Sequence, residues 1–270
     1  MGEFDGKVAI VTGAGRLRGI GRAAAVSMAR LGADVVVTGT GRNPDTFPPD
    51  EKAVGWKDVE SVAEQVRAQG RRALTLTVDV TNREHVQDMV DRTVRELGRV
   101  DILVNNAAFA RGPDRVPIVD LDPDIFQRVL DIKVTGTYLC TRAFIKKVIE
   151  QGDGGKIVNI SSSAGKRGSP NTLAYNAGNF AVVGMTQSMA KELGPHGINV
   201  NCVCPGAVDT HRMDDLGRGE RWEEMAANTP IGRHGTDDEI GDFIAYLCTK
   251  AASWIHGQSI NLNGGTVVEH

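Results

Sequence analysis

The sequence has 270 residues, of which 41% are hydrophobic and 24% charged, and its formal net charge is −3. These ordinary values describe a globular chain that can bury a substantial core, and the charge gives no reason to expect a nucleic-acid or membrane-surface partner. No apolar run approaches the roughly 20 residues that span a bilayer, and residues 1–7 lack the apolar core of an export signal. We therefore expect a cytoplasmic protein.

Short β-branched runs alternate with helix-length segments along the chain. The expected strands are Val8–Thr12, Val35–Thr38, Leu74–Val78, Ile102–Asn105, Ile157–Ile160, Ile198–Cys204 and Ser259–Leu262. The expected helices are Ile20–Leu31, Lys57–Gln69, Arg83–Leu97, Pro123–Ile149, Tyr175–Leu193 and Asp237–Cys248. The strands are almost continuously apolar, as in sheets covered on both faces. Without a repeat or linker to divide residues 1–270, this pattern predicts one domain: a Rossmann-type, doubly wound α/β fold with a parallel sheet of about seven strands.

Two stretches lack such a pattern. Gly39–Trp56 carries three prolines and predicts an extended loop after the second strand. Ala207–Pro230 is polar, with a short helical segment possible around Arg221–Ala227. Because this second stretch follows the sixth strand at its carboxyl end, where open α/β sheets bind ligands, it is either a mobile substrate lid or a plain surface excursion.

The first strand leads into a glycine-rich turn and then a helix. The turn reads Thr12-Gly13-Ala14-Gly15-Arg16-Leu17-Arg18-Gly19-Ile20-Gly21. Glycines let the backbone approach a pyrophosphate, and the helix N-terminus supplies free N–H groups and the positive end of a dipole. A tight turn that only needs positive φ is the alternative, but this many glycines in the first βαβ unit favour a dinucleotide site.

The end of the second strand indicates which dinucleotide is bound. NAD enzymes usually place an acid there for the ribose 2′-OH, whereas this strand ends at Gly39 without one. Arg42 follows, Arg16 and Arg18 lie in the glycine turn, and a guanidinium can pair bidentately with a 2′-phosphate. We therefore expect NADP(H) to be favoured over NAD(H), unless these arginines are solvated or bind only the pyrophosphate.

The fifth strand is followed by Ser162, and Tyr175 comes thirteen residues later. With these residues, the sequence resembles the short-chain dehydrogenase/reductase family over nearly its whole length. The other matching pieces, in order, are Gly19 and Gly21, Asp79, Asn105-Asn106-Ala107, Pro205-Gly206 with Thr210, Gly257-Gln258 and Gly264-Gly265. The resemblance implies an NAD(P)-dependent oxidoreductase for a small carbonyl or alcohol substrate. It also implies a homotetramer, in which the helices expected at 123–149 and 175–193 would pack against their mates.

The resemblance implies a role for each matching residue. Tyr175 would be the general acid/base that exchanges a proton with the substrate oxygen, and Ser162 would hydrogen-bond that oxygen. Asp79 would contact the adenine, and Thr210 would hold the nicotinamide carboxamide. The residues that would contact the cofactor are Gly13, Arg16, Arg18, Gly19, Ile20, Gly21, Arg42, Asp79, Val80, Asn106, Ala107, Tyr175, Pro205, Gly206, Val208 and Thr210.

The sequence departs from the family pattern at the glycine turn, which is two residues longer than usual, and at the catalytic tyrosine. The family's Tyr-x-x-x-Lys ends here in Asn179, and the family's asparagine on the preceding long helix is Lys133. The two residue types are exchanged. A tyrosine has a pKa near ~10, so its anion needs a nearby cation at neutral pH.

Lys133 shares an apolar helix face with Phe126, Val129 and Leu130, where an unpaired ammonium would be costly. We predict that Lys133 replaces the missing lysine and that Asn179, one turn after Tyr175, orients ribose hydroxyls or a water. The missing lysine favours an alternative function, a catalytically impaired NADP(H)-binding sensor or scaffold. The retained Ser162, Tyr175 and Thr210 favour the oxidoreductase.

The substrate would be selected by loops at the carboxyl edge of the sheet, namely 109–115, 163–172 and 207–230. Arg111, Lys166 and Arg167 could favour an anionic group, although exposed basic residues are usually only solvated.

Four cysteines are present, and Cys202 and Cys204 lie two apart in a strand-like run, so they point to the same face. They could form half of a metal site, but no second pair has zinc-site spacing. We expect no metal and interpret Cys140, Cys202, Cys204 and Cys248 as buried thiols in a reducing compartment.

Overall fold

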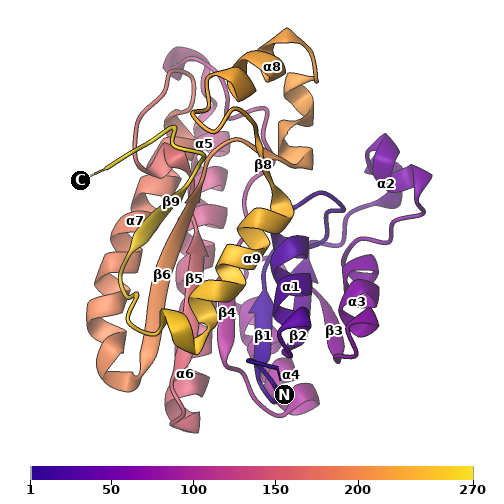
Figure 1. Cartoon of the computed structure of the whole chain (residues 1–270), viewed down its shortest axis with the longest axis vertical. Coiled ribbons are helices and arrows are strands. Elements are labelled where there is room, and N and C mark those ends of the chain that lie inside the picture. The colour runs from indigo at the N-terminus through magenta and orange to yellow at the C-terminus, as the bar shows by residue number, and fades with distance from the viewer. Residues whose placement is uncertain (1, 270) are drawn as a thin grey trace.

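The computed structural model of the protein describes residues 2–269. A parallel sheet of seven strands in the order β3-β2-β1-β4-β5-β6-β9 forms its centre (Figure 1). The strands are β1 Val8–Val11, β2 Asp34–Gly39, β3 Ala73–Thr77, β4 Ile102–Asn105, β5 Gly155–Ile160, β6 Ile198–Pro205 and β9 Ser259–Leu262. The strand order reverses between β1 and β4, as in doubly wound folds, and confirms the predicted fold class.

Helices cover both faces of this sheet. They are α1 Ile20–Arg30, α2 Pro49–Ala53, α3 Val59–Ala68, α4 Arg83–Leu97, α5 Pro123–Leu130, α6 Gly136–Gln151, α7 Leu173–Leu193, α8 Glu220–Ala227 and α9 Asp237–Cys248. In Figure 1, α1 and α9 lie in front of the sheet. Within residues 2–269, no helix combines the length and the apolar character needed to cross a membrane.

The core divides into two layers because strand side chains alternate between the two faces. On β1, Ala9 and Val11 pack in the layer that contains α1, α3 and α9. Val8 and Ile10 pack in the layer that contains α4, α6 and α7. All four are at most 1% exposed, which explains the continuous apolar run in the sequence.

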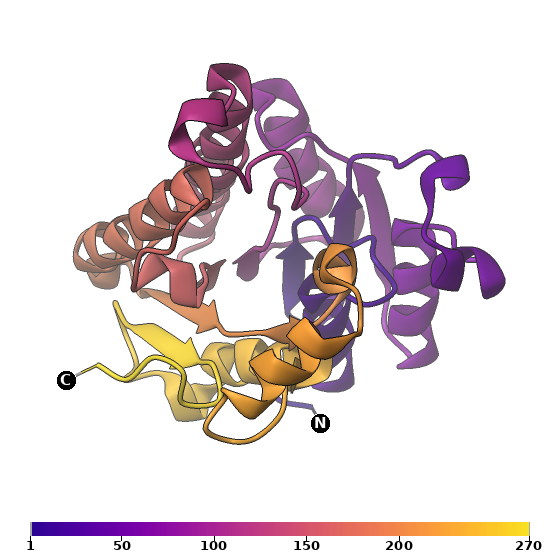
Figure 2. The same ribbon diagram turned by 90° about the horizontal axis from the view of Figure 1, so that it is seen from above.

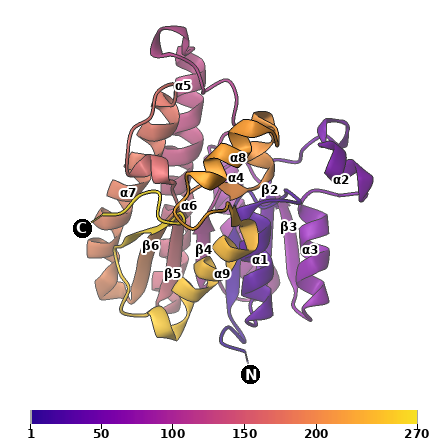
Figure 3. The ribbon, with the colours of Figure 1, turned by 45° about the horizontal axis from the view of Figure 1, so that its top comes forward.

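The stretch 39–56 is not the extended loop that we expected. It contains a 3₁₀ turn at Pro44–Thr46 and the short helix α2, which stands away from the sheet (Figures 1 and 3). Pro49 occupies the first position of α2, where a missing N–H costs nothing. The prolines therefore start a helix here.

The long helix expected at 123–149 is interrupted. A π-helical turn at Asp131–Thr135 separates α5 from α6, and Lys133 lies in this turn. Such turns are frequent at functional sites because the wider turn redirects a side chain. A π-helical turn holds one more residue than an α-helical turn, and the spacing of apolar residues in the sequence does not indicate where that residue is added.

The segment after β6 forms β7 Val208–Asp209, a 3₁₀ helix at His211–Leu216 and α8, whose bounds include the expected 221–227. β7 pairs in parallel with β8 Gly235–Thr236. The view from above shows α8 over the carboxyl ends of the strands (Figure 2). The segment therefore lies where a lid would, although its mobility stays a prediction.

Candidate active site

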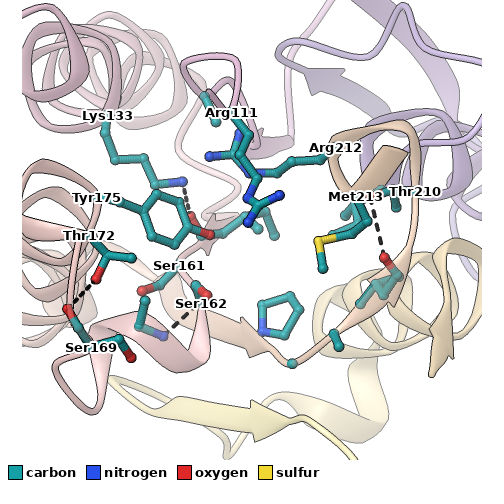
Figure 4. Close-up of a pocket in the computed structure, with 18 of the residues that line it drawn as sticks. Arg111, Lys133, Ser161, Ser162, Ser169, Thr172, Tyr175, Thr210, Arg212 and Met213 are labelled. Atoms are coloured by element: carbon teal, nitrogen blue, oxygen red, sulfur yellow. Dashed lines mark hydrogen bonds between the residues drawn. The ribbon is translucent and has the colours of Figure 1, made fainter. Parts of the chain in front are cut away.

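A cavity of about 320 Å³ lies at the carboxyl ends of β4, β5 and β6. The predicted catalytic residues Ser162, Tyr175 and Lys133 line it (Figure 4). Residues predicted to hold the cofactor also line it, namely Ile20, Asn106, Pro205, Gly206, Val208 and Thr210. The fold therefore brings residues from distant parts of the sequence to one site beside the switch point of the sheet.

Ser162 lies two residues after the end of β5, and Tyr175 lies in the first turn of α7. The loop between them is fixed by Asn176, whose Nδ2 donates to the carbonyl oxygens of Ala164 and Arg167, each at 2.7 Å. The backbone N–H of Ala164 donates to Ser162 Oγ at 3.2 Å. These bonds hold the loop that carries Ser162 against the first turn of α7, which carries Tyr175.

Lys133 enters the site from the π-helical turn and is only 6% exposed. Its Nζ donates to the carbonyl oxygen of Ile160. Its stem passes Gly178, where a Cβ atom would lie 3.3 Å from Lys133 Cβ and Cγ. Burial lowers the pKa of Lys133, while the charge of Tyr175 opposes that shift. The prediction that Lys133 lies beside Tyr175 is consistent with this geometry, and its catalytic role stays a prediction.

Two further cations contact the tyrosine, and the sequence reasoning missed both roles. The guanidinium carbon of Arg115 lies 3.9 Å from the centroid of the Tyr175 ring, and that of Arg212 lies 4.9 Å from it. Arg212 Nη1 also donates to the carbonyl oxygen of Phe109 at 2.5 Å. Both arginines lie in the stretches that we expected to select the substrate, 109–115 and 207–230. Arg212 follows Thr210 by two residues, and this spacing could have indicated that it lies near the nicotinamide.

These charges change the acidity of Tyr175. Burial by itself would raise the pKa of Tyr175, but the positive charge of Arg212, the hydroxyl of Ser162, Lys133 and Arg115 together lower it below its usual value. Arg212 has a larger effect than Lys133. The tyrosinate is therefore favoured by cations from three different segments.

Asn179 lies one helical turn after Tyr175 and makes its hydrogen bond within α7. Its Nδ2 donates to the carbonyl oxygen of Tyr175 at 2.8 Å, one turn back along the same helix. The residue is 1% exposed, and its Oδ1 has no hydrogen-bond partner within the described chain. The predicted contact of Asn179 with ribose hydroxyls or a water stays a prediction.

Close backbone contacts shape the glycine turn. Gly13 has φ +65°, and a Cβ atom on Gly21 would lie 2.6 Å from Asn106 Nδ2. That Nδ2 donates to the carbonyl oxygens of Thr12 and Gly13, both at 2.9 Å. α1 begins after Gly19, which caps it without a side chain. The Gly19 N–H itself donates to Asp237 Oδ2 at 2.9 Å, and contacts of this turn with a pyrophosphate stay a prediction.

The arginines expected to bind a 2′-phosphate are instead paired with carboxylates. Arg42 Nη1 donates to Glu51 Oε2 at 2.6 Å, and Arg42 Nε donates to Asp58 Oδ1 at 2.9 Å. Arg16 Nη1 lies 3.8 Å from Glu51 Oε2. Arg18 bonds to a separate acidic set, Asp50, Asp209 and Asp214. The free positive charge on which the NADP(H) preference depended is neutralised in this structure.

The carboxylate of Asp58 lies near the end of β2, at which the strand itself has no acidic residue. A Cβ atom on Gly39 would lie 3.5 Å from Asp58 Oδ2, and one on Gly15 would lie 1.9 Å from Asp58 Oδ1. The carboxylate therefore lies between the glycine turn and the end of β2, although it comes from the residue before α3. Nothing in the sequence spacing revealed this placement.

The remaining cofactor positions lie outside the cavity. Asp79 accepts from Thr81 Oγ1 at 2.7 Å and from Arg128 Nη2 at 3.3 Å. Val80 is buried and packs against Gly136. The backbone N–H of Ala107 donates to Thr12 Oγ1 at 3.1 Å. Contacts of these residues with adenine or ribose stay predictions.

The four cysteines are free and buried. Across residues 2–269, no group of three or more His, Cys, Asp or Glu side chains is placed to hold a metal ion. Cys202 and Cys204 therefore lack the further ligands that half of a metal site would need.

Comparison with known proteins gives a consistent family. The family model described as enoyl-(acyl carrier protein) reductase matches residues 13–267. The short chain dehydrogenase/reductase astE of Aspergillus oryzae is 37% identical over 267 residues, which cover 97% of this chain and 95% of the relative. A 3-oxoacyl-[acyl-carrier-protein] reductase from Synechocystis is 33% identical over 269 residues and is covered over 100% of its length. Carveol dehydrogenase from Mycobacterium avium in complex with NAD has a TM-score of 0.87 at 29% identity, with 100% of both chains covered.

Proposed function

Since the chain belongs to the short-chain dehydrogenase/reductase family, we propose that it is an NAD(P)(H)-dependent carbonyl reductase or alcohol dehydrogenase with Tyr175 as its general acid/base. The observation that carries this proposal is the meeting of Ser162 and Tyr175 in one cavity with Thr210 and the other residues expected at the nicotinamide. When bound, the nicotinamide supplies or accepts the hydride.

The chain's own residues handle the oxygen and its proton. During reduction, Tyr175 Oη gives its proton to the carbonyl oxygen as that oxygen gains charge, and the resulting tyrosinate is stabilised by Arg212, Lys133 and Arg115. The Ser162 hydroxyl donates a hydrogen bond to the same oxygen. During oxidation the proton returns from the alcohol to the tyrosinate.

A catalytically impaired sensor or scaffold was the alternative, because the family lysine is missing. A buried lysine and two arginines beside Tyr175 offer the positive charge that the missing lysine would have supplied. Groups with perturbed pKa values cluster at catalytic sites, so the lowered pKa of Tyr175 beside these cations supports the enzyme.

The ion pairs of Arg42 change the cofactor preference that we expect. We expected NADP(H), but Arg42 is paired with Glu51 and Asp58, and a 2′-phosphate would lie near both carboxylates. We therefore propose that NAD(H) binds at least as tightly as NADP(H). The carveol dehydrogenase of similar fold was solved with NAD.

We also propose a homo-oligomer. Tyr138 on α6 and Phe180 on α7 are 50% and 46% exposed, and Leu173 at the start of α7 is 44% exposed. Large apolar side chains on neighbouring helices are typical of subunit contacts. A tetramer and a cytoplasmic location stay predictions.

A substrate screen tests the proposed function. We expect oxidation of NADH or NADPH with some members of a panel of ketones and aldehydes, and loss of that activity in Tyr175→Phe by a factor of about 10² or more. Cofactor binding without turnover of any panel member, by wild type, would support the sensor instead.

A further inference from the structure

The charge lining the cavity is strongly one-sided. Arg111, Arg115, Lys133 and Arg212 line it, and no acidic side chain of residues 2–269 does. Ligand cavities are ordinarily lined by apolar groups with a few polar ones, and burying several cations together is costly without anions. The cavity therefore requires negative charge from elsewhere.

Two of these cations are already held by the protein. Arg111 forms an ion pair with Asp215. Lys133 donates to the carbonyl oxygen of Ile160 from a position only 6% exposed. Neither side chain is free to take hold of a new anion without giving up its present contact.

The other two cations keep unused hydrogen-bond donors. Arg212 makes no ion pair within the described chain, and its one hydrogen bond there is to the carbonyl oxygen of Phe109. Arg115 Nη1 lies 3.2 Å from Asp114 Oδ2, but neither atom makes a hydrogen bond within residues 2–269. Both guanidinium groups lie over the Tyr175 ring, and Figure 4 shows Arg212 reaching toward Tyr175 from the opposite wall.

The four cations of the cavity are only partly balanced by negative charges of the protein. Asp114 and Asp215 balance two of the four cations. A tyrosinate at Tyr175 balances a third during the reaction. Among the protein's own groups one positive charge remains, which a substrate carboxylate would balance. Building on the function proposed above, we propose that the substrate carries a carboxylate and that Arg212 and Arg115 bind it beside Tyr175.

The substrate has room beyond its carboxylate, because a neighbouring cavity of about 480 Å³ shares Ser162, Pro205 and Met225 with this one. The volume of the cation-lined cavity itself is about 320 Å³, and part of it lies against residues expected at the nicotinamide, such as Thr210 and Pro205. Ala164, Met213 and Met225 add apolar surface. The geometry thus points to an oxo or hydroxy acid with an apolar body.

The same arginines also lower the pKa of Tyr175, so anion binding has to be separated from that effect. A role confined to the tyrosine would change the pH profile equally for charged and neutral substrates. A carboxylate contact would instead change KM for acids and leave KM for neutral analogues unaltered. Matched acids and esters distinguish the two roles.

The test uses short 2-oxo and 3-oxo acids, such as pyruvate and acetoacetate, each paired with its methyl ester. Binding to the protein with NADH or NADPH is followed by cofactor fluorescence, and turnover by cofactor absorbance. We expect at least one acid to bind about tenfold or more tightly than its ester, since a charge-assisted contact has that effect. Arg212→Gln should remove this preference through KM, and Arg212→Lys should restore part of it.

Arg95→Gln is the matched control, because Arg95 is a 63% exposed residue on α4 and should change nothing. Esters that bind as tightly as acids, acids that do not bind at all, or an unchanged preference in Arg212→Gln would overturn the inference. Turnover of esters alone would overturn it while leaving the proposed oxidoreductase intact. Acids that bind through Arg212 without turnover of any pair would support the carboxylate site and contradict the proposed function.

Discussion

Tyr175 receives positive charge from three segments instead of from the fourth residue along its own helix. Lys133 lies in the π-helical turn, Arg115 in the loop after β4, and Arg212 in the 3₁₀ helix at His211–Leu216. A lysine stem tolerates a changed point of origin because four rotatable carbons carry its ammonium. The exchange of lysine and asparagine therefore preserves the charge near the tyrosine, while the buried amide of Asn179 bonds to its own helix.

Lys133→Met should lower kcat roughly tenfold and move the alkaline side of the pH profile upward. Removing a nearby cation raises the pKa of Tyr175, so the tyrosinate forms at higher pH. Alcohol oxidation, which needs the tyrosinate, then begins at higher pH, and carbonyl reduction, which needs the protonated tyrosine, continues to higher pH. A shift of about one pH unit is expected. Initial rates across pH in both directions measure it.

Lys133→Asn alone should be impaired in the same way. Adding Asn179→Lys recreates the usual family arrangement and should recover part of the loss, which a double-mutant cycle reports as coupling. If Lys133→Met keeps the wild-type kcat and pH profile while Tyr175→Phe is inactive, then Arg212 and Arg115 suffice and Lys133 is a structural residue.

Asp58→Asn should move cofactor preference toward NADP(H). The substitution removes one negative charge near the expected ribose 2′ position, keeps a hydrogen-bond acceptor for Arg42, and keeps the size of the side chain. A unit charge about 4 Å away contributes about 1 kcal/mol when water screens it fully, so the ratio of the NADPH and NADH dissociation constants should fall roughly fivefold or more. Titration of cofactor fluorescence measures both constants. An unchanged ratio would place the 2′ position away from Asp58.

At the scale of elements, Arg18 links three segments that are distant in sequence. From the glycine turn it bonds to Asp50 in α2 at 2.9 Å, and to Asp214 in the 3₁₀ helix after β7 at 2.6 Å. These hydrogen bonds raise its pKa, so the guanidinium stays charged. The pairing ties the insertion after β2 to the segment that covers the cavity.

Arg18→Met should loosen that covering segment without unfolding the protein. Partly exposed ion pairs contribute roughly 0–1 kcal/mol each, so the thermal midpoint should change by a few degrees at most. Amide hydrogen exchange over residues 209–217 should accelerate several-fold, and KM should rise. Arg30→Met, which removes a surface pair with Asp242, is the control. Unaltered exchange in Arg18→Met would show that the segment is held by its packing alone.

At the scale of the whole molecule, the sequence predicts the sheet well because apolar periodicity is a local signal. β4, β9, α4 and α9 have the expected bounds, and the spacing of Ser162 and Tyr175 brings both to one cavity. The roles of Arg212, Arg115 and Asp58 could not be predicted. Each depends on how an aperiodic loop folds back, and loop conformation is set by tertiary contacts that no local pattern encodes.

The exposed apolar side chains of α6 and α7 argue for an assembly, which is the remaining property of the whole molecule. Tyr138 and Phe180 would be buried between subunits, since a single chain leaves them 50% and 46% exposed. Phe180→Asp would place a charge in that apolar contact and should shift a tetramer toward dimers or monomers. Light scattering at micromolar concentration measures the mass directly. Val54→Asp, on the projecting end of α2 and 63% exposed, should leave the assembly unchanged. A monomeric wild type would mean that these helices contact solvent or another partner.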